Sequence, residues 1–353
     1  MRQQMKKLCD IYLTVFISLP LAVLYLFYNS PCYAQQDTKF TLFNYNYTLI
    51  NPAAAGSKEK ISLVALHRQQ WTGIKTAPVT SSLCVDMPLL RIRSAVALNF
   101  MNESLGITKS TFVGVSYAVI ARLSTYGRLS GGIQMGVNQM RVNFADANTD
   151  PNNATLGTDA ALNYGSNLTQ YNFQTGLGVY YYDNKFKIGI SIPTLNPYNY
   201  FGAGNGTKQS HFYLISGMNF SINNKILYNP RLLVKFTMNA PIQFDLYNQF
   251  ILSEKLALGF TIRSSEAIAA VVAYTFHPQF NIAYAYDAVV LNKLRAQQAG
   301  SHEIAINYLL PLKIFAKQHA KIRASRKRKC IDYDNNNRTK LFKDIENIFY
   351  DKN

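Results

Sequence analysis

Residues 129–138 read LSGGIQMGVN, and this stretch decides the fold because its side chains alternate in polarity. The first set is Leu129, Gly131, Ile133, Met135 and Val137, and the second is Ser130, Gly132, Gln134, Gly136 and Asn138. Successive side chains of a β-strand point to opposite faces, so the first set is expected to face lipid and the second a polar lumen. The stretch therefore predicts a strand of a transmembrane barrel.

The same alternation recurs from residue 61 to residue 312. It predicts strands at 61–70, 78–86, 92–101, 110–122, 127–141, 169–182, 185–193, 209–222, 227–238, 242–252, 255–263, 267–276, 279–287 and 301–312. Single-chain bacterial barrels have an even number of antiparallel strands. We therefore expect an all-β fold, a transmembrane antiparallel β-barrel of about fourteen strands.

The composition of the 353-residue chain agrees with a barrel, with 48% hydrophobic residues and 24 Tyr and 21 Phe against one Trp. Tyr suits a membrane interface, where an apolar ring carries a hydroxyl that needs water. A soluble β-sandwich is the alternative, and its outward face would be polar. The apolar face here carries many large aromatics, and strands of about ten residues suit a tilted membrane span.

The connections predict an orientation, because long and short ones alternate along most of the chain. The segments from Gln69 to Ala77, Asn143 to Leu168 and Thr194 to Lys208 are long, and those at Met87 to Arg91, 183–184 and 223–224 are short. The short connections at Asn239 and at 264–266 are exceptions. Outer-membrane barrels have short periplasmic turns, so we expect the outer membrane of a diderm bacterium with both termini periplasmic.

The N-terminal residues predict a signal peptide over 1–34, since basic residues precede an apolar run at 11–28 and small residues follow it. The run is long for a signal peptide, so an uncleaved helical anchor is the alternative. The predicted organisation is a cleaved signal peptide at 1–34, a periplasmic lead-in at 35–60, the barrel at 61–312 and a basic periplasmic tail at 313–353.

The chain has a net charge of +17, and a large part of it lies in the tail, which holds 12 Lys and Arg against 5 Asp and Glu. Its densest run ends in Arg326, Lys327, Arg328 and Lys329. Behind a signal peptide this run meets no nucleic acid, so an acidic periplasmic partner, anionic lipid and plain solvation are the alternatives. Apolar residues at helical spacing over 341–349 indicate a short amphipathic helix or a frayed end.

Residues 51–88 read NPAAAGSKEKISLVALHRQQWTGIKTAPVTSSLCVDMP, a turn opening, a strand, the single Trp and a second strand that begins at a Pro. Further motifs follow in order at 229–235, 240–246, 258–263, 282–287 and 300–304. Together they resemble the PorP/SprF family, outer-membrane proteins of the type IX secretion system. The family usually has Ser where Arg231 stands. The motif residues that we single out are Asn51, Pro52, Gly56, Arg68, Gln70, Trp71, Pro78, Ser301, His302 and Glu303.

The resemblance implies a non-enzymatic component that assists export or surface anchoring of adhesin-like cargo with C-terminal signal domains, in systems linked to gliding motility. Its implied partners are outer-membrane lipid, the secreted adhesin-like proteins and periplasmic secretion-ring proteins. A diffusion channel or hydrophobic-ligand transporter is the alternative. A wide lumen with an ordered N-terminal plug would favour the transporter, and a narrow lumen packed with side chains would favour the anchor.

No catalytic, metal or cofactor site is expected. His302 and Glu303 lie side by side on a predicted strand and point to opposite faces, which does not suit a zinc motif. No GxSxG elbow, P-loop or other small-molecule site is recognisable, so we expect no enzyme and no small-molecule substrate.

Two expectations concern contacts. Trp71 is expected either to anchor at the outer interface or to contact a secreted partner. A three-residue loop at 239–241 would place Lys235 opposite Asp245, as an ion pair in the lumen.

Overall fold

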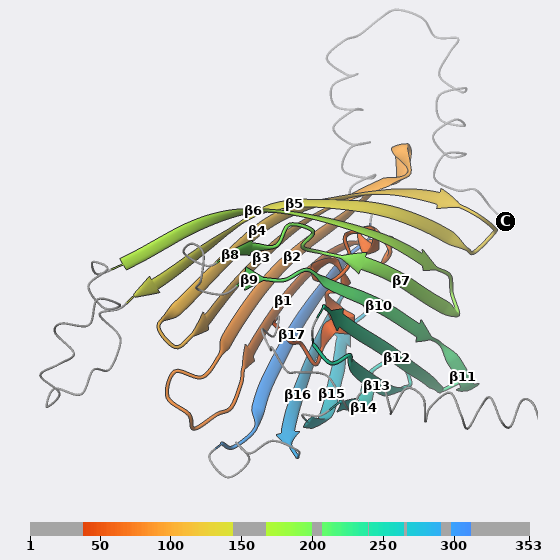
Figure 1. The fold of residues 1–353 in the computed structure, drawn as a ribbon. Helices are drawn as coiled ribbons and strands as arrows, with labels where there is room; N and C mark the ends of the chain where they lie inside the picture. The colour runs from red at the N-terminus through yellow and green to blue at the C-terminus, as the bar shows by residue number, and fades with distance from the viewer. Residues whose placement is uncertain are drawn as a thin grey trace, which may run out of the picture. The chain divides into compact units, whose positions relative to one another are not determined.

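The computed structural model describes residues 38–143, 167–199, 207–238, 240–264, 267–290 and 298–311. They form a closed antiparallel barrel (Figure 1). The predicted signal peptide, its alternative as a helical anchor, and the predicted tail fall outside the described residues. Among the residues that are described, no helix is both long and apolar enough to cross a membrane.

Each strand pairs with its neighbours in the chain, β1 closes the ring on β17, and β10 pairs with both β7 and β12. The strands are β1 (Ile61–Gln69), β2 (Val79–Leu89), β3 (Ser94–Leu105), β4 (Thr108–Arg122), β5 (Arg128–Asn143), β6 (Asn167–Tyr182), β7 (Phe186–Ile192), β10 (His211–Met218), β11 (Phe220–Asn223), β12 (Ile226–Thr237), β13 (Gln243–Leu252), β14 (Leu256–Arg263), β15 (Ala267–His277), β16 (Phe280–Val289) and β17 (Ser301–Leu310). β10 and β11 continue one another on either side of Asn219, so these fifteen segments form fourteen barrel strands, which confirms the predicted fold.

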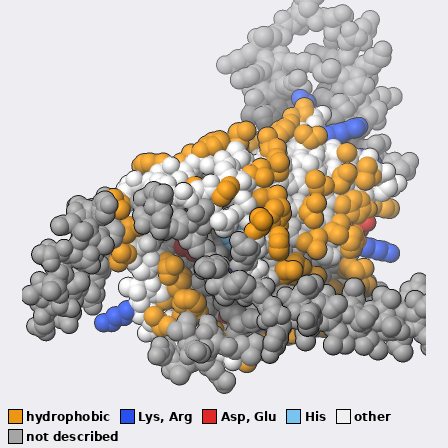
Figure 2. Space-filling view, viewed as in Figure 1, with side chains coloured by type: hydrophobic (Ala, Val, Ile, Leu, Met, Phe, Trp, Pro, Cys, Tyr) orange, Lys and Arg blue, Asp and Glu red, His pale blue; other side chains and the backbone are white. Residues whose placement is uncertain are grey.

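The predicted faces of the strands are those observed. On β5, Leu129, Ile133 and Met135 are exposed on the outside, while Ser130 and Gln134 are buried inside. Hydrophobic side chains spread over the outer face, with the few visible Lys and Arg side chains at its margins (Figure 2). This outer face is the surface that a bilayer requires of a β-barrel.

Two tight turns show why the chain reverses where it does. The carboxylate of Asp183 accepts hydrogen bonds from the backbone N–H groups of Lys185 (2.7 Å) and Phe186 (2.6 Å). The amide oxygen of Asn223 does the same for Lys225 and Ile226, both at 2.8 Å. Asp and Asn side chains commonly close turns in this way, so local sequence determines both hairpins.

The barrel has two different ends. The loop end carries the connections at 70–78, 106–107, 144–166, 193–210, 238–242, 264–266 and 290–300. The turn end carries those at 90–93, 123–127, 183–185, 224–225, 253–255 and 278–279. A second, two-stranded sheet of β8 (Tyr198–Asn199) and β9 (Thr207–Lys208) belongs to the connection between β7 and β10.

Residues 38–58 form a plug inside the ring of strands, drawn in red and orange in Figure 1. Three 3-10 turns build it, η1 (Phe43–Tyr45), η2 (Tyr47–Leu49) and η3 (Pro52–Ala54). A fourth, η4 (Leu90–Ile92), lies in a turn of the barrel. Residues 35–60 were expected from the sequence to be a periplasmic lead-in, whereas the described part of this segment lies in the lumen.

The plug runs from the loop end to the turn end. The hydroxyl of Thr38 donates to Glu103, near the loop end of β3, at 2.8 Å. The backbone N–H of Gly56 donates to Asp86, near the turn end of β2, at 2.7 Å. β17 also ends at the turn end, where Leu310 pairs with Ile61. The first described residues of the plug therefore lie at the loop end, and the last residues of β17 lie at the turn end. The termini that were expected to be periplasmic fall outside the described residues.

Glycine lets the plug approach the wall closely. A Cβ atom on Gly132 would lie 2.4 Å from the backbone nitrogen of Ala53, well inside van der Waals contact. The side chain of Asn51 caps η3 by accepting from Ala53 N–H (2.9 Å), and it donates to the carbonyl of Val179 (3.1 Å). Pro52 occupies the first position of η3, where a missing N–H costs nothing.

Candidate functional site

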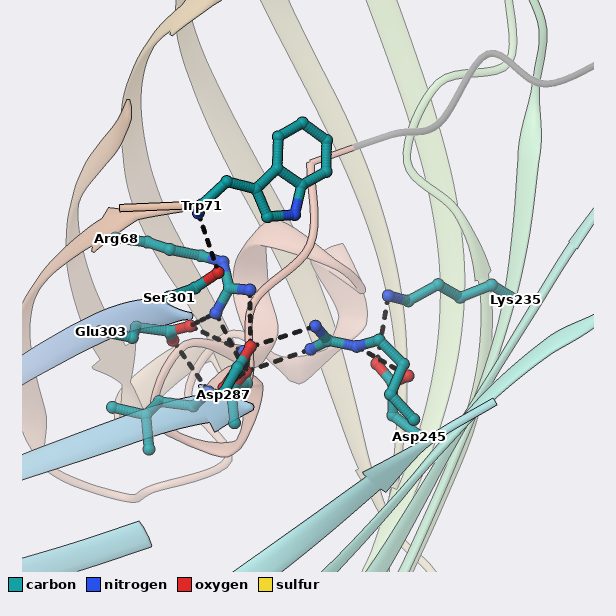
Figure 3. A network of polar contacts seen from close by, with 10 residues as sticks. Arg68, Trp71, Lys235, Asp245, Asp287, Ser301 and Glu303 are labelled. Atoms are coloured by element: carbon teal, nitrogen blue, oxygen red, sulfur yellow. Dashed lines mark hydrogen bonds and ion pairs between the residues drawn. The ribbon is translucent and has the colours of Figure 1, made fainter. Parts of the chain in front are cut away.

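A group of buried charges lies inside the barrel toward the loop end, and Arg68 of β1 is at its centre (Figure 3). One guanidinium nitrogen of Arg68 is 2.6 Å from Asp287 Oδ2 on β16, and another is 2.7 Å from Glu303 Oε2 on β17. All three side chains alternate inward on their strands, which brings residues more than 200 positions apart into contact.

The group continues around the wall. Arg263 of β14 lies 3.3 Å from Asp287 and 3.2 Å from Asp245 of β13, and Lys235 of β12 lies 3.2 Å from Asp245. We call these six residues, Arg68, Lys235, Asp245, Arg263, Asp287 and Glu303, the ionic network. Three positive and three negative charges balance within it, which a buried group of charges requires.

The ionic network holds the start of the plug. The Glu303 carboxylate accepts the backbone N–H groups of Thr41 and Leu42, both at 2.8 Å. The Thr41 hydroxyl donates to Asp287 at 2.8 Å and accepts from Arg68 at 3.0 Å and Arg263 at 3.1 Å. Backbone and hydroxyl groups of the plug thus supply hydrogen bonds to Glu303, Asp287 and the two arginines.

This arrangement makes the plug and the wall depend on each other. Removing one partner from a buried ion pair costs about 3–5 kcal/mol, because the remaining charge stays buried without compensation. The ionic network has a structural role, since each of its carboxylates contacts cations or accepts from N–H donors. Among the described residues, no cluster of His, Cys, Asp and Glu has the arrangement of a metal site.

A second cluster secures the middle of the plug with aromatic rings. Arg231 of β12 donates to the hydroxyl of Tyr47 and lies 5.6 Å from the centre of the same ring. The Tyr47 ring is 6.2 Å from that of Tyr180, and Phe43 is 6.0 Å from Tyr247. Ring packing and a cation over a ring both stabilise the plug, and these rings belong to one buried cluster with Leu42 and Ile50.

Polar contacts also fasten η2. The Thr48 hydroxyl lies 2.9 Å from Cys84 Sγ on β2 and 2.9 Å from the amide oxygen of Asn99 on β3. The Ser191 hydroxyl of β7 donates to the carbonyl of Ile50 at 2.8 Å. The plug therefore has fixed contacts with strands on several sides of the lumen.

The residues singled out from the sequence fall into three places. Asn51, Pro52 and Gly56 belong to the plug, and Arg68 and Glu303 belong to the ionic network. Gln70, Trp71 and Pro78 lie in the connection after β1, where the backbone N–H of Trp71 donates to the Ser301 hydroxyl at 3.1 Å. His302 is half-buried on the strand face opposite Glu303, 2.7 Å from the hydroxyl of Tyr284.

Lys235 and Asp245 form an ion pair, but in a register different from the expected one. Lys235 pairs with Gln243 across the strands, and Asp245 pairs with Leu233. The last pair of the ladder before the connection is Lys235 with Gln243, so the register is shifted by two positions from the expected one. The Lys235 side chain is long enough to reach its partner diagonally.

Sequence reasoning did not assign Thr41, Asp287, Arg263 or Arg231 to a site. The alternation of the strands predicts that the side chains of Asp287 and Arg263 point inward. Two inward arginines, Arg68 and Arg263, need inward carboxylates as partners, and this requirement would have indicated the ionic network. The role of Thr41 could not be predicted, because this residue lies in a segment whose sequence has no periodic pattern.

The fold and this site define the chain as an outer-membrane β-barrel whose lumen is occupied by its own N-terminal segment. Residues 32–308 match the family described as type IX secretion system membrane protein PorP/SprF. The chain belongs to this family, and it is an outer-membrane component of the type IX secretion system.

Three similar solved structures share little sequence identity with this chain. Omp33 of Acinetobacter baumannii is 9% identical, with a TM-score of 0.42, over 71% of this chain and 98% of its own. The CymD monoaromatic hydrocarbon channel is 9% identical, with a TM-score of 0.42, over 75% and 92%. A FadL homologue of Pseudomonas aeruginosa is 10% identical, with a TM-score of 0.38, over 74% and 93%. No curated protein matches the chain.

Proposed function

We propose that this chain is a non-enzymatic anchor of the secretion apparatus, which assists export or surface attachment of adhesin-like cargo that carries C-terminal signal domains. Family membership supports the secretion role. The single structural observation that supports the anchoring role is the plug, which fills the lumen and is tied to the wall by the ionic network. A barrel closed in this way does not suit passage of a polypeptide.

The orientation that we propose places the turn end in the periplasm and the loop end outside. The plug then begins on the outer side, and the chain after β17 continues on the periplasmic side. The basic tail would there be available to periplasmic secretion-ring proteins, which are the partners that we propose for it. Cargo would be met at the loop end or at the outer face of the barrel.

A transporter of small or hydrophobic ligands is the second candidate, and the ordered plug is the observation that favours it. We expected an ordered N-terminal plug in a transporter and a packed lumen in an anchor, and this barrel has both features. The polar contacts at Thr41, Thr48 and Asn51 hold the plug at three levels of the lumen, which favours the anchor.

Deletion of the gene tests the proposed function. The readout is surface display of a fluorescent reporter fused to the C-terminal signal domain of an adhesin-like protein from the same bacterium. We expect display to fall and to return on complementation with the full chain. Normal display in the deletion strain, together with loss of uptake of an apolar solute, would instead support the transporter.

A further inference from the structure

Two cations lie near one another on the inner face of the wall, outside the ionic network. Lys187 of β7 pairs across the strands with Gly217 of β10, and Gly217 pairs in turn with Arg231 of β12. All three alternate inward, in phase with the buried residues Ser191 on β7 and Leu233 on β12. Neighbouring strands are about 4.8 Å apart, so the two Cα atoms that carry these cations are separated by only about 10 Å.

Gly217 lets the two cations approach one another. A Cβ atom on Gly217 would lie 3.3 Å from Cγ of Arg231, which is a tight contact. Because glycine has no side chain, the stem of Arg231 can lie against β10, the strand between the two cations. Lys187 and Arg231 are close enough to interact electrostatically, and like charges repel.

Neither cation contacts a carboxylate. Lys187 has no hydrogen bond or ion pair within the described part of the chain. Arg231 donates to the Tyr47 hydroxyl, but its Nε atom is buried and has no hydrogen-bond partner among the described residues. In the ionic network, by contrast, every cation contacts a carboxylate.

The charges around this pair do not balance either. Lys58, at the end of the plug, interacts electrostatically with Lys187, Arg231 and Asp86. The hydrogen-bond partners of Lys58, a carbonyl and a hydroxyl, are neutral. The three cations are partly buried, and with Asp86 as the only acid in this group two positive charges remain uncompensated. Charges removed from bulk water are normally paired, so this part of the lumen favours an anion.

A buried hydroxyl on β6 adds a third donor. Tyr180 is 0% exposed, and its hydroxyl has no hydrogen-bond partner among the residues that the structure describes. It interacts electrostatically with Arg231, and its ring lies 6.2 Å from that of Tyr47. Buried polar groups are nearly always hydrogen-bonded, so this hydroxyl indicates an acceptor that the protein itself does not supply.

We propose that Lys187, Arg231 and Tyr180 bind a phosphate group between the plug and strands β6, β7 and β12. A guanidinium pairs with phosphate oxygens in a bidentate manner, and an ammonium binds them as a point charge. A phosphomonoester or inorganic phosphate carries roughly two negative charges near neutral pH, which matches the uncompensated charge, whereas a carboxylate carries one. Since Arg231 also holds Tyr47, the bound phosphate strengthens the attachment of the plug.

Calorimetric titration of the full chain in detergent with inorganic phosphate tests the proposal. Lys187→Met removes one cation that has no protein partner, so the barrel should still assemble. Lys185→Met is the matched control, because Lys185 is an exposed cation in the turn just before β7. We expect phosphate affinity to fall at least tenfold in Lys187→Met and to stay within twofold of wild type in Lys185→Met.

The midpoint of urea unfolding provides a readout that a merely structural lysine would not give. In chloride, Lys187→Met should unfold at the same or a higher urea concentration than wild type, because repulsion with Arg231 is removed. In phosphate of equal ionic strength, the midpoint should rise for wild type and not for Lys187→Met. A variant that is less stable than wild type by the same amount in both buffers would contradict the proposal.

A glycine variant keeps both charges and changes only the space between them. Gly217→Val would push the stem of Arg231 away from β10, and it should weaken phosphate binding as strongly as Lys187→Met does. Gly131→Val is the control, because Gly131 has open space around it. Unchanged phosphate affinity in an assembled Gly217→Val barrel would show that the group does not bind beside β10.

The source of the phosphate is distinguished by a second probe, short-chain phosphatidic acid, which presents the same group on a lipid. Binding of both probes in competition supports a site for any phosphomonoester, and binding of phosphatidic acid alone, weakened by Lys187→Met, assigns the group to a lipid. Acetate that raises the midpoint as much as phosphate at equal ionic strength would overturn the phosphate assignment. Absence of binding by both probes, or equal affinities in wild type and Lys187→Met, would overturn the site.

Discussion

Glu303 shows how much of this barrel depends on single side chains. Its carboxylate is fully buried, and it accepts from two plug N–H groups and from Arg68. Parity along β17 predicts that Glu303 faces inward, but not that a plug satisfies it. The role of Glu303 in holding the plug therefore could not be predicted from the sequence, because it depends on hydrogen bonds from the Thr41 and Leu42 N–H groups.

Glu303→Ala should lower the free energy of unfolding by about 3–5 kcal/mol, because it leaves Arg68 with one counter-charge and two plug N–H groups without an acceptor. The midpoint of urea unfolding in detergent, followed by heat-modifiability on gels, measures the change. Glu59→Ala is the control, since the pair of Glu59 with Arg128 is partly exposed and contributes at most about 1 kcal/mol. Equal shifts in the two variants would show that the ionic network does not fasten the plug.

At the scale of elements, the strands were predictable and the plug was not. Alternation of the kind seen on β5 has a fixed period of two, and a membrane enforces it on every strand. The plug consists of short 3-10 turns whose polar groups are satisfied by the wall, so its sequence has no period. The error in register between Lys235 and Asp245 has the same origin, because the position of the turn sets the register and a turn carries no periodic signal.

Gly132→Ala should loosen the plug, because the added Cβ atom would collide with the backbone of Ala53. The neighbouring Gly131 faces outward with open space around it, so Gly131→Ala is a matched control on the same strand. We expect limited proteolysis to cut the plug faster in Gly132→Ala, at unchanged barrel content. An unchanged cleavage rate would mean that the plug is not held against β5.

For the whole molecule, the path of the plug makes a topological prediction. An epitope inserted between Asn152 and Asn153, in the connection after β5, should be labelled on intact cells, and so should one inserted between Gln36 and Asp37. One inserted between Asn223 and Asn224, at the turn end, should be labelled only after permeabilisation. The observed direction of the plug would be contradicted by one combination of results. In that combination the epitope after Asn152 is labelled on intact cells, but the epitope after Gln36 is labelled only after permeabilisation.

The tail at 313–353 is predicted from its sequence to be a periplasmic appendage and not part of the wall. Removing residues 323–353 deletes the densest basic run and should leave the barrel assembled and heat-modifiable. We expect reporter display to fall, because the proposed contact with secretion-ring proteins is lost. Unchanged display would mean that the tail is only solvated.

A disulfide between the plug and the wall tests most directly whether this barrel works with its lumen closed. The Thr48 hydroxyl lies 2.9 Å from Cys84 Sγ, so Thr48→Cys would place two thiols close enough to form a bond of about 2 Å with little adjustment. The variant is made in a Cys330→Ser background, and Thr48→Ser is the control. We expect the oxidised, locked barrel to conduct no ions in planar bilayers and to support reporter display at the level of the control. Loss of display on oxidation, with recovery on reduction, would show that the plug must move and would contradict a closed anchor.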